Sequence, residues 1–112
     1  MKDIEWKDFK KVDLSVGTIV EVNDFPEARE PAYILHVDFG EEIGVKKSSA
    51  QITDLYSKED LQGKKVIGVV NFPPKQIGPI MSECLVTGFH QENGDVALAV
   101  PDLDVPNGTR LS

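Results

Sequence analysis

The sequence predicts an all-β domain: a five-stranded Greek-key barrel with one short helix between its third and fourth strands. Three observations favour this fold. Short apolar, β-branched stretches recur between turn residues, one capped helical turn falls between the third and fourth of them, and the long first stretch contains a glycine at which it can bend. A chain of 112 residues has room for one core. We therefore expect a single domain over residues 1–112, with a barrel core at about 12–90 and short N- and C-terminal extensions at 1–11 and 91–112.

The composition is that of an ordinary globular protein, 40% hydrophobic and 28% charged. No apolar run approaches the roughly 20 residues that a membrane-spanning helix needs, and residues 1–11 lack the apolar region of a secretory signal, so we expect a cytoplasmic protein. Cys84 is the single cysteine, which excludes an intramolecular disulfide, and with two distant histidines it cannot complete a zinc site. We expect neither a metal nor a cofactor.

The N-terminal extension predicts one short helix. Residues 3–11 place Trp6 and Phe9 among charged residues without a period of two, which indicates a helical turn capped by Asp3. A helix of this length is marginal in water by itself. Trp6 and Phe9 must therefore pack either on the sheet of their own chain or on a second subunit.

Three strands follow. Residues 12–22 alternate apolar and polar and change phase at Gly17, which predicts a long strand with a bulge at that glycine. Residues 32–39 are rich in aromatic and β-branched side chains and predict the second strand. A short acidic turn containing glycine leads to the third strand, near residues 44–48, so these two strands form a hairpin.

A helical turn and the remaining strands complete the pattern. Ser57 with Asp60 resembles a capping box, which predicts a helical turn over residues 57–62. Residues 65–71 and 84–89 predict the fourth and fifth strands, and residues 96–100 are a further candidate strand in the tail. Three strands, a short helix and two strands is the element order of the OB fold, whose face and loops commonly hold oligonucleotides.

The charge of the chain is unevenly distributed. The net charge is −7, yet residues 44–80 carry six lysines against three acidic residues, a net +3, whereas residues 12–43 carry −7. We take this basic zone in an acidic protein as the first indication of function. The isoelectric point of about 4.7 is far below that of dedicated nucleic-acid binders, so any affinity for RNA should be modest and sensitive to salt.

Several sequence blocks resemble one known family. The opening FKKVDLSVGTI at residues 9–19 looks like the start of the tRNA-binding domain that is appended to methionyl-tRNA synthetases. The details are closer to one branch of that family, the CsaA-type secretion chaperones. The matching blocks, which cover nearly the whole chain, are REPAY at 29–33, DFG at 38–40, KSSAQIT at 47–53, VNFPPKQI at 70–77 and Ser82-Glu83.

This resemblance implies an OB-fold barrel whose short terminal extensions pair two subunits into a homodimer. It also implies an export-related chaperone with kinship to tRNA-binding proteins. The related tRNA-binding domains usually carry basic residues in the first strand, where this chain has Ser15 and Thr18. That difference argues against strong tRNA binding.

The candidate RNA-binding residues are basic or small and polar: Arg29, Lys46, Lys47, Ser48, Ser49, Gln51, Lys64, Lys65 and Lys75. Cationic groups displace counterions from a phosphate backbone, and hydroxyls and amides can bond to a backbone. Two simpler interpretations stay open. Lysines on edge strands also prevent sheet aggregation, and serine and asparagine, including Asn71, often bond their own main chain in loops.

The apolar candidates crowd residues 72–81, to which we add one tyrosine: Tyr33, Phe72, Pro73, Pro74, Ile77, Ile80 and Met81. We expect no regular strand there, because prolines lack the donor that a strand ladder needs. An exposed apolar patch usually marks a partner site. Three interpretations stay open: a dimer contact, a groove for unfolded polypeptide, or a plug that closes one end of the barrel.

The aromatic residues Trp6, Phe9, Phe25 and Tyr33 have two interpretations, stacking on bases and packing in the core or an interface. We favour packing and assign Trp6 and Phe9 to the dimer extension. His36, His90 and Cys84 have no neighbouring ligands in the sequence, so we expect structural roles for them.

Enzymatic signatures such as a phosphate-binding glycine loop, a nucleophile elbow or HExxH are absent from the sequence, so we expect no catalysis. The leading hypothesis is a cytoplasmic homodimeric chaperone that binds unfolded export precursors. The alternative is a tRNA-binding module that acts in trans. A third possibility is a structural dimer that docks on a translocation motor.

Overall fold

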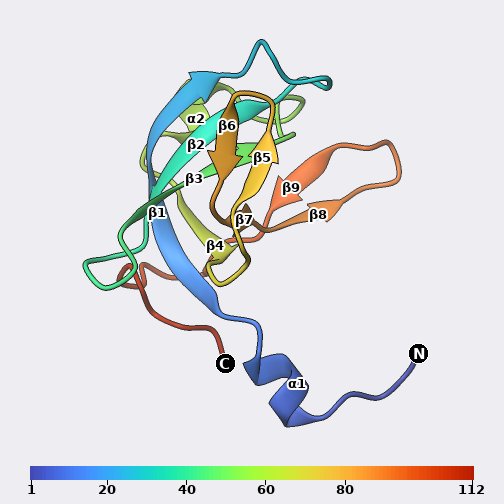
Figure 1. Cartoon of the computed structure of the whole chain (residues 1–112), viewed down its shortest axis with the longest axis vertical. Helices are drawn as coiled ribbons and strands as arrows, with labels where there is room; N and C mark the ends of the chain where they lie inside the picture. Colours follow the sequence, from blue (N-terminus) through green and yellow to red (C-terminus); the bar gives the residue numbers. More distant parts are fainter.

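Five antiparallel strands form one strongly curved sheet in the computed structural model, which describes all 112 residues (Figure 1). The strand order is β3-β2-β1-β4-β7. The bounds are β1 Leu14–Asp24, β2 Tyr33–Asp38, β3 Val45–Ala50, β4 Lys65–Val69 and β7 Leu85–Val86. The sheet curls into a nearly closed barrel, which confirms the predicted all-β OB-fold class.

The long strand β1 serves both halves of the barrel. Its residues 18–24 pair with β2 and its residues 14–18 pair with β4. The register shifts between Ile19 and Glu21, so the bulge lies at Val20 and the prediction of a bulge at Gly17 is wrong. Gly17 instead allows a close approach, because a Cβ atom there would lie 2.6 Å from the Val37 side chain and 2.7 Å from the Phe39 ring.

Phe39 fills the middle of the barrel. Its side chain is 1% exposed, and its ring packs over the backbone of Gly17 and of Gly68, where an added Cβ would lie 2.8 Å from the ring. Other fully buried side chains surround it: Ile19, Leu35, Val37, Leu61 and Val66. These residues come from β1, β2, α2 and β4, so one core holds the whole sheet together.

Helix α2, Lys58–Leu61, caps the core between β3 and β4, as predicted. The predicted capping box is present: Ser57 Oγ accepts a hydrogen bond from the Asp60 N–H at 3.1 Å, and Asp60 accepts one from the Ser57 N–H at 2.9 Å. The hydrogen bond that the Asp60 carboxylate accepts from the Ser57 N–H, and after it that from the Ser57 side chain, hold the pKa of Asp60 below its usual value. The helix buries Leu61 completely.

The segment after β4 forms a hairpin that we did not expect. Strand β5, Lys75–Ile77, pairs with β6, Ile80–Ser82, through a turn at Gly78 and Pro79. The prediction that residues 72–81 contain no regular strand is wrong, because Pro73 and Pro74 precede β5 and Pro79 lies in the turn. No ladder donor is therefore missing.

The predicted fifth strand, residues 84–89, divides into β7 and β8, Gly88–His90. Thr87 marks the division, since its N–H and its hydroxyl both bond the Ile67 carbonyl, at 3.0 and 2.7 Å. Strand β8 then turns away from the barrel and pairs with β9, Val96–Leu98. The candidate strand at residues 96–100 is thus one arm of a second hairpin, visible on the right of Figure 1.

Both ends of the chain lie below the barrel (Figure 1). Helix α1, Trp6–Lys10, begins after a capping box between Glu5 and Asp8, so the prediction of Asp3 as the cap is wrong. The C-terminal segment lies along β1 where β2 has left it, with the Val16 N–H donating to the Thr109 carbonyl at 3.0 Å. Neither helix of the chain is long and apolar enough to cross a membrane.

Candidate functional site

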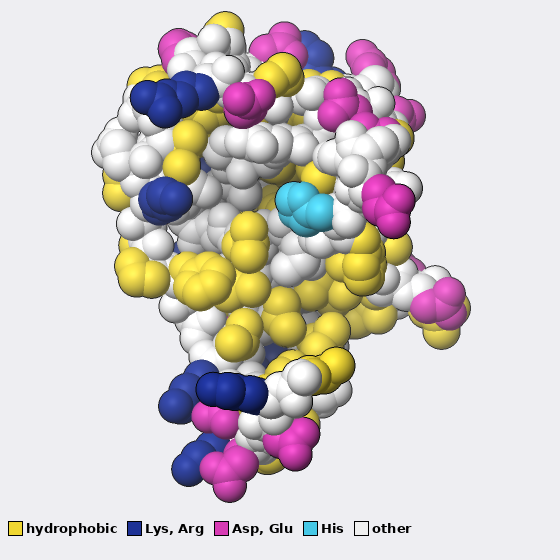
Figure 2. Space-filling view, turned by 90° about the vertical axis from the view of Figure 1, so that its right-hand side faces the viewer, with side chains coloured by type: hydrophobic (Ala, Val, Ile, Leu, Met, Phe, Trp, Pro, Cys, Tyr) yellow, Lys and Arg dark blue, Asp and Glu magenta, His cyan; other side chains and the backbone are white.

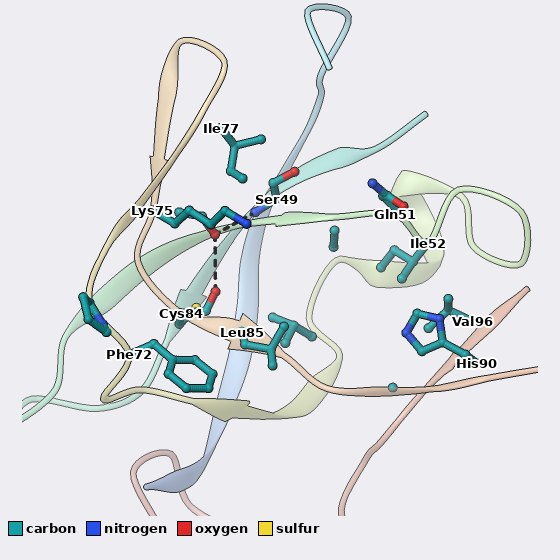
Figure 3. Close-up of a pocket in the computed structure, with 15 residues that line it drawn as sticks. Ser49, Gln51, Ile52, Phe72, Lys75, Ile77, Cys84, Leu85, His90 and Val96 are labelled. Carbon is teal, nitrogen blue, oxygen red and sulfur yellow. Dashed lines mark hydrogen bonds between the residues drawn. The ribbon is translucent and has the colours of Figure 1, made fainter. Parts of the chain in front are cut away.

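A groove with a volume of about 540 Å³ opens at the seam of the barrel, between β3 and the last strand of the sheet, β7. Figure 3 shows Ser49 and Gln51 on one side of it and Phe72 and Leu85 on the other. The volume lies within the range of ordinary ligand sites. The groove exists because β3 and β7 are the two ends of the strand order and do not pair with each other.

Residues 82–84 bridge only one end of the seam. The Glu83 N–H donates to the Lys47 carbonyl at 2.7 Å, and the Glu83 carboxylate accepts from the Lys47 N–H at 2.9 Å. Ser82 Oγ accepts a longer bond of 3.4 Å from the Ser49 N–H. Beyond Ser49 no bridge of this kind continues, so the groove opens along Ala50, Gln51 and Ile52.

The groove is mainly apolar. Phe72, which is 52% exposed, lines it with Pro73, Ile77, Leu85, Val86 and Val96. On the face that lies to the right in Figure 1, apolar side chains form a broad area that carries few charges (Figure 2). A half-exposed phenylalanine in such a setting is a typical feature of a partner site.

Only part of the predicted apolar patch lies in the groove. Phe72, Pro73 and Ile77 line it, whereas Pro74, Ile80 and Met81 belong to the same segment but are not among its lining residues. Tyr33 lies apart from the groove: its hydroxyl donates to the Tyr56 carbonyl at 2.8 Å, and its ring packs against the core. We therefore remove Tyr33 from the candidate site.

The predicted basic residues do not form one surface. Lys75 is the only lysine, arginine or acidic residue that lines the groove. Lys46 and Lys47 lie on β3, where successive side chains point to opposite faces, so the two diverge. Ser48 shares its face with Lys46 and is 1% exposed, so its hydroxyl is not available to a ligand, whereas Ser49 and Gln51 line the groove.

The other basic candidates lie elsewhere. Lys65 is half-buried at the far side of the sheet, where its ammonium donates to the Val105 carbonyl and pairs with Asp104 at 3.4 Å. Lys64 lies over the Tyr56 ring, 5.9 Å from its centroid. Arg29 is exposed in the loop between β1 and β2. These three residues are thus separated from the groove, and Lys65 holds the C-terminal segment in place.

Asn71 bonds the main chain, which is the simpler interpretation that the sequence left open for it, but its partners lie far from its own loop in the sequence. Its side-chain amide donates to the Lys11 carbonyl at 2.8 Å, and its carbonyl oxygen accepts from the Asp13 N–H at 2.9 Å. Arg110 reinforces the same junction by donating to the Lys10 carbonyl at 2.7 Å. These bonds fix the direction in which α1 leaves the barrel.

Helix α1 presents aromatic surface to solvent. Trp6 is 62% exposed, the helix buries none of its residues, and the Trp6 and Phe9 rings lie 5.3 Å apart, centroid to centroid. The preceding Ile4 is also exposed. The sequence left two interpretations for this helix, packing on its own sheet and packing on a second subunit. Trp6 does not pack on its own sheet.

The thiol and the histidines offer no reactive centre of their own. Burial raises the pKa of the Cys84 thiol to about 11, so the thiol is protonated at neutral pH and packs as a small apolar group at the base of the groove. His90 lines the groove, and His36 lies 3.7 Å from the Glu21 carboxylate. No group of three or more His, Cys, Asp or Glu side chains is placed to hold a metal ion.

The barrel is an OB fold, a class of binding domain that commonly holds oligonucleotides, and comparison with known families agrees. Residues 14–110 match the model of the family described as "Putative tRNA binding domain". The match covers most of the chain, so the chain belongs to this tRNA-binding-domain family. The family is one of binding domains, and the chain is a binding domain rather than an enzyme.

Within that family, two solved chaperones resemble the chain along its length. The chaperone CsaA from Bacillus anthracis is 48% identical with a TM-score of 0.93, covering 99% of this chain and 100% of its own. The CsaA chaperone protein from Picrophilus torridus is 51% identical with a TM-score of 0.91, covering 98% and 100%. The resemblance to the CsaA branch that the sequence motifs indicated is confirmed.

The curated relatives are much longer proteins. The methionine–tRNA ligase from Thermococcus onnurineus is 36% identical over 108 residues, which are 96% of this chain but 14% of the ligase. The similarity therefore concerns one part of the ligase. It supports the kinship with tRNA-binding proteins and carries no ligase activity over to this chain.

Proposed function

We propose that the chain is a homodimeric cytoplasmic chaperone that binds unfolded segments of export precursor proteins in the groove at the barrel seam. The observation that carries this proposal is the exposed apolar lining of the groove, with Phe72 half-exposed at its wall. An unfolded chain exposes the large apolar side chains that a folded protein keeps mostly buried, so it can cover this surface. The similarity to CsaA chaperones supports the same function.

Phe72→Ala is expected to weaken binding of unfolded protein about tenfold. Covering the exposed half of a phenylalanine contributes about 1–1.5 kcal/mol, and 1.4 kcal/mol is a factor of ten in the dissociation constant. The probe is fluorescein-labelled lactalbumin that has been reduced and carboxymethylated so that it stays unfolded, and the measurement is an anisotropy titration. Phe89→Ala is the matched control, because Phe89 is exposed on the neighbouring strand β8 but does not line the groove.

The same variants separate two of the three interpretations of the apolar segment, the dimer contact and the groove for unfolded polypeptide. If Phe72 belongs to the peptide site, sedimentation of Phe72→Ala gives the same oligomeric state as the parent protein. Monomers in its place would assign Phe72 to the subunit interface. Equal affinity of parent and Phe72→Ala would contradict a peptide site at this groove.

Binding of tRNA is the second candidate function, and the family match over residues 14–110 favours it. The available cations near the groove are Lys46, Lys47 and Lys75. Replacing all three with glutamine is expected to weaken tRNA binding and to reduce the slope of log K against log salt by up to about 2.1–2.7, since each phosphate contact contributes about 0.7–0.9. The control replaces Lys2, Lys7 and Lys10, which makes the same change of charge in the N-terminal extension.

Salt distinguishes the two candidates. Phosphate binding weakens steeply as salt rises, whereas capture of an apolar chain holds or strengthens. Labelled bulk tRNA is titrated at low and at physiological salt, with the unfolded lactalbumin as competitor. Tight tRNA binding at physiological salt that ignores the competitor would favour the RNA module, and an unchanged slope in the triple variant would exclude these three lysines as its surface.

A further inference from the structure

The groove separates two strand edges that no other strand of the chain pairs. Strand β3 pairs only with β2, and β7 pairs only with β4, so neither has a strand partner at the seam. Glu83 and Ser82 bond the edge of β3 only at Lys47 and Ser49, and beyond Ser49 that edge is free. Both edges line the groove, through Ser49–Gln51 on β3 and just beyond it and through Leu85 and Val86 on β7. A free strand edge is a ready template for another strand.

The main-chain groups along β3 alternate in direction. Lys47 turns its N–H and its carbonyl toward Glu83, across the seam, and the Ser49 N–H points the same way to Ser82. In an antiparallel pair every second residue bonds the partner strand, so Ser48 and Ala50 bond β2, while Lys47, Ser49 and Gln51 face the seam.

At Gln51 these seam-facing groups have no partner. Neither the N–H nor the carbonyl of Gln51 takes part in a hydrogen bond within the chain. The Ser49 carbonyl accepts only a long bond of 3.5 Å from the hydroxyl of Ser48. The open end of the groove therefore presents one donor and two acceptors of the main chain in the spacing of a strand.

The charge of the lining limits which kind of ligand suits the groove. Lys75 is its only charged side chain, and no carboxylate lines the groove. A phosphate backbone would meet one cation among apolar walls, whereas an extended peptide brings main-chain donors and acceptors for β3 and apolar side chains for Phe72 and Leu85. An acidic side chain on that peptide would complement Lys75.

We infer that the seam accepts an extended peptide as an added strand along β3, held by main-chain hydrogen bonds to Ser49 and Gln51, with a preference for apolar segments that carry an acidic residue. This inference rests on the proposed function and specifies how its ligand is recognised. Hydrogen bonds to the main chain of a peptide do not depend on its side chains, and every peptide has this main chain. One groove can therefore hold many different unfolded segments.

The test uses a fluorescein-labelled peptide of seven alternating valine and threonine residues with a central glutamate, and five variants that each carry one N-methylated amide. N-methylation removes a donor and blocks strand pairing at that position. Because alternate amides of an added strand face β3, we expect a loss of tenfold or more at every second position and a small effect between them. Replacing glutamate with lysine is expected to weaken binding about threefold or more.

A pair of protein variants tests the same hydrogen bonds by changing the protein instead of the peptide. Gln51→Pro removes the Gln51 N–H, and Gln51→Ala removes only the side chain, so we expect the proline variant to bind the peptide at least tenfold more weakly than the alanine variant. Thermal unfolding reports whether Gln51→Pro folds, and the N-methylated series decides the matter if it does not.

The outcomes separate this inference from the function on which it rests. A period of two in the N-methylated series supports an added strand. Equal binding of all methylated peptides, or binding of unfolded lactalbumin but not of the alternating peptide, overturns the added strand and leaves the chaperone function standing. If neither the peptide nor the unfolded protein binds, the proposed function fails as well.

Discussion

Phe39→Ala is expected to lower the free energy of unfolding by about 3–5 kcal/mol, the usual cost of emptying a phenylalanine site in a core. The ring is 1% exposed and packs against the glycine backbones of β1 and β4, which come too close to leave room for any other side chain. Glycines cannot extend into the empty space, so little of the cavity can collapse. A typical domain has 5–15 kcal/mol of stability in total, so the variant should be marginal at 37 °C.

The measurement is urea unfolding followed by far-ultraviolet circular dichroism at one fixed protein concentration, because self-association would shift the midpoint. Phe89→Ala is the matched control, since Phe89 is 67% exposed and its removal should change the free energy by less than about 0.5 kcal/mol. A loss below about 1 kcal/mol in Phe39→Ala would contradict a barrel packed around this ring.

The close packing of Gly17 against the Phe39 ring can be tested by the same urea unfolding. Gly17→Ala places a methyl group 2.7 Å from the Phe39 ring and should cost about 1–3 kcal/mol through overpacking. In the background of Phe39→Leu, which shortens the obstructing side chain, the cost of Gly17→Ala should fall. The difference is a coupling free energy between the two positions.

Local signals in the sequence predicted the elements of the barrel. Alternation and β-branched residues identified the strands within a few residues, and the Ser57–Asp60 capping box identified α2, because these features are set by neighbours in the chain. The bulge was misplaced because two different events lie close together in β1. At Gly17 the backbone comes close to the Phe39 ring. The extra residue of the bulge is Val20, and nothing in the sequence distinguishes it from the other residues of the strand.

The hairpin at residues 75–82 was not predicted because the prolines of this segment were taken to exclude a strand, whatever their positions in it. Proline disrupts a ladder only where its missing N–H would have paired, and none of the three prolines falls at such a position. Gly78 before Pro79 is the local signal that could have revealed the turn, since it adopts a positive φ of 54°.

The sequence predicted only one side of the groove, the side formed by residues 72–77. Phe72, Pro73, Ile77 and Lys75 lie close together in the sequence, so they could be named together. The residues of the other side are Leu85, Val86, His90 and Val96. They join the groove only because β7 ends just before Thr87 and β8 turns away, a long-range event without a local signal. Likewise the lysines formed one basic zone in the sequence but lie on different faces and strands of the barrel.

Trp6→Ala is expected to weaken self-association of the chain about 30-fold or more. The proposed homodimer needs an apolar surface on the extensions, and α1 presents Trp6 and Ile4 to solvent. A tryptophan that becomes buried at the centre of an interface typically accounts for 2 kcal/mol or more of the binding free energy. Sedimentation equilibrium over a wide range of protein concentrations measures the dissociation constant, and Leu55→Ala, at a 45% exposed leucine before α2, is the control.

Asn71 tests whether the position of the helix matters as well as its side chains. Asn71→Ala leaves Trp6 in place but removes the two hydrogen bonds that Asn71 makes at the junction of α1 and β1. Only the bond from Arg110 to the Lys10 carbonyl then remains of the three side-chain bonds described there, so the direction of the helix is less firmly fixed. An interface that needs a preformed helix must then be ordered on binding, and the dissociation constant should rise about three- to tenfold. A monomeric parent protein would end the homodimer proposal. Full-strength association in Trp6→Ala would instead move the interface away from α1 and toward the groove that Phe72 lines.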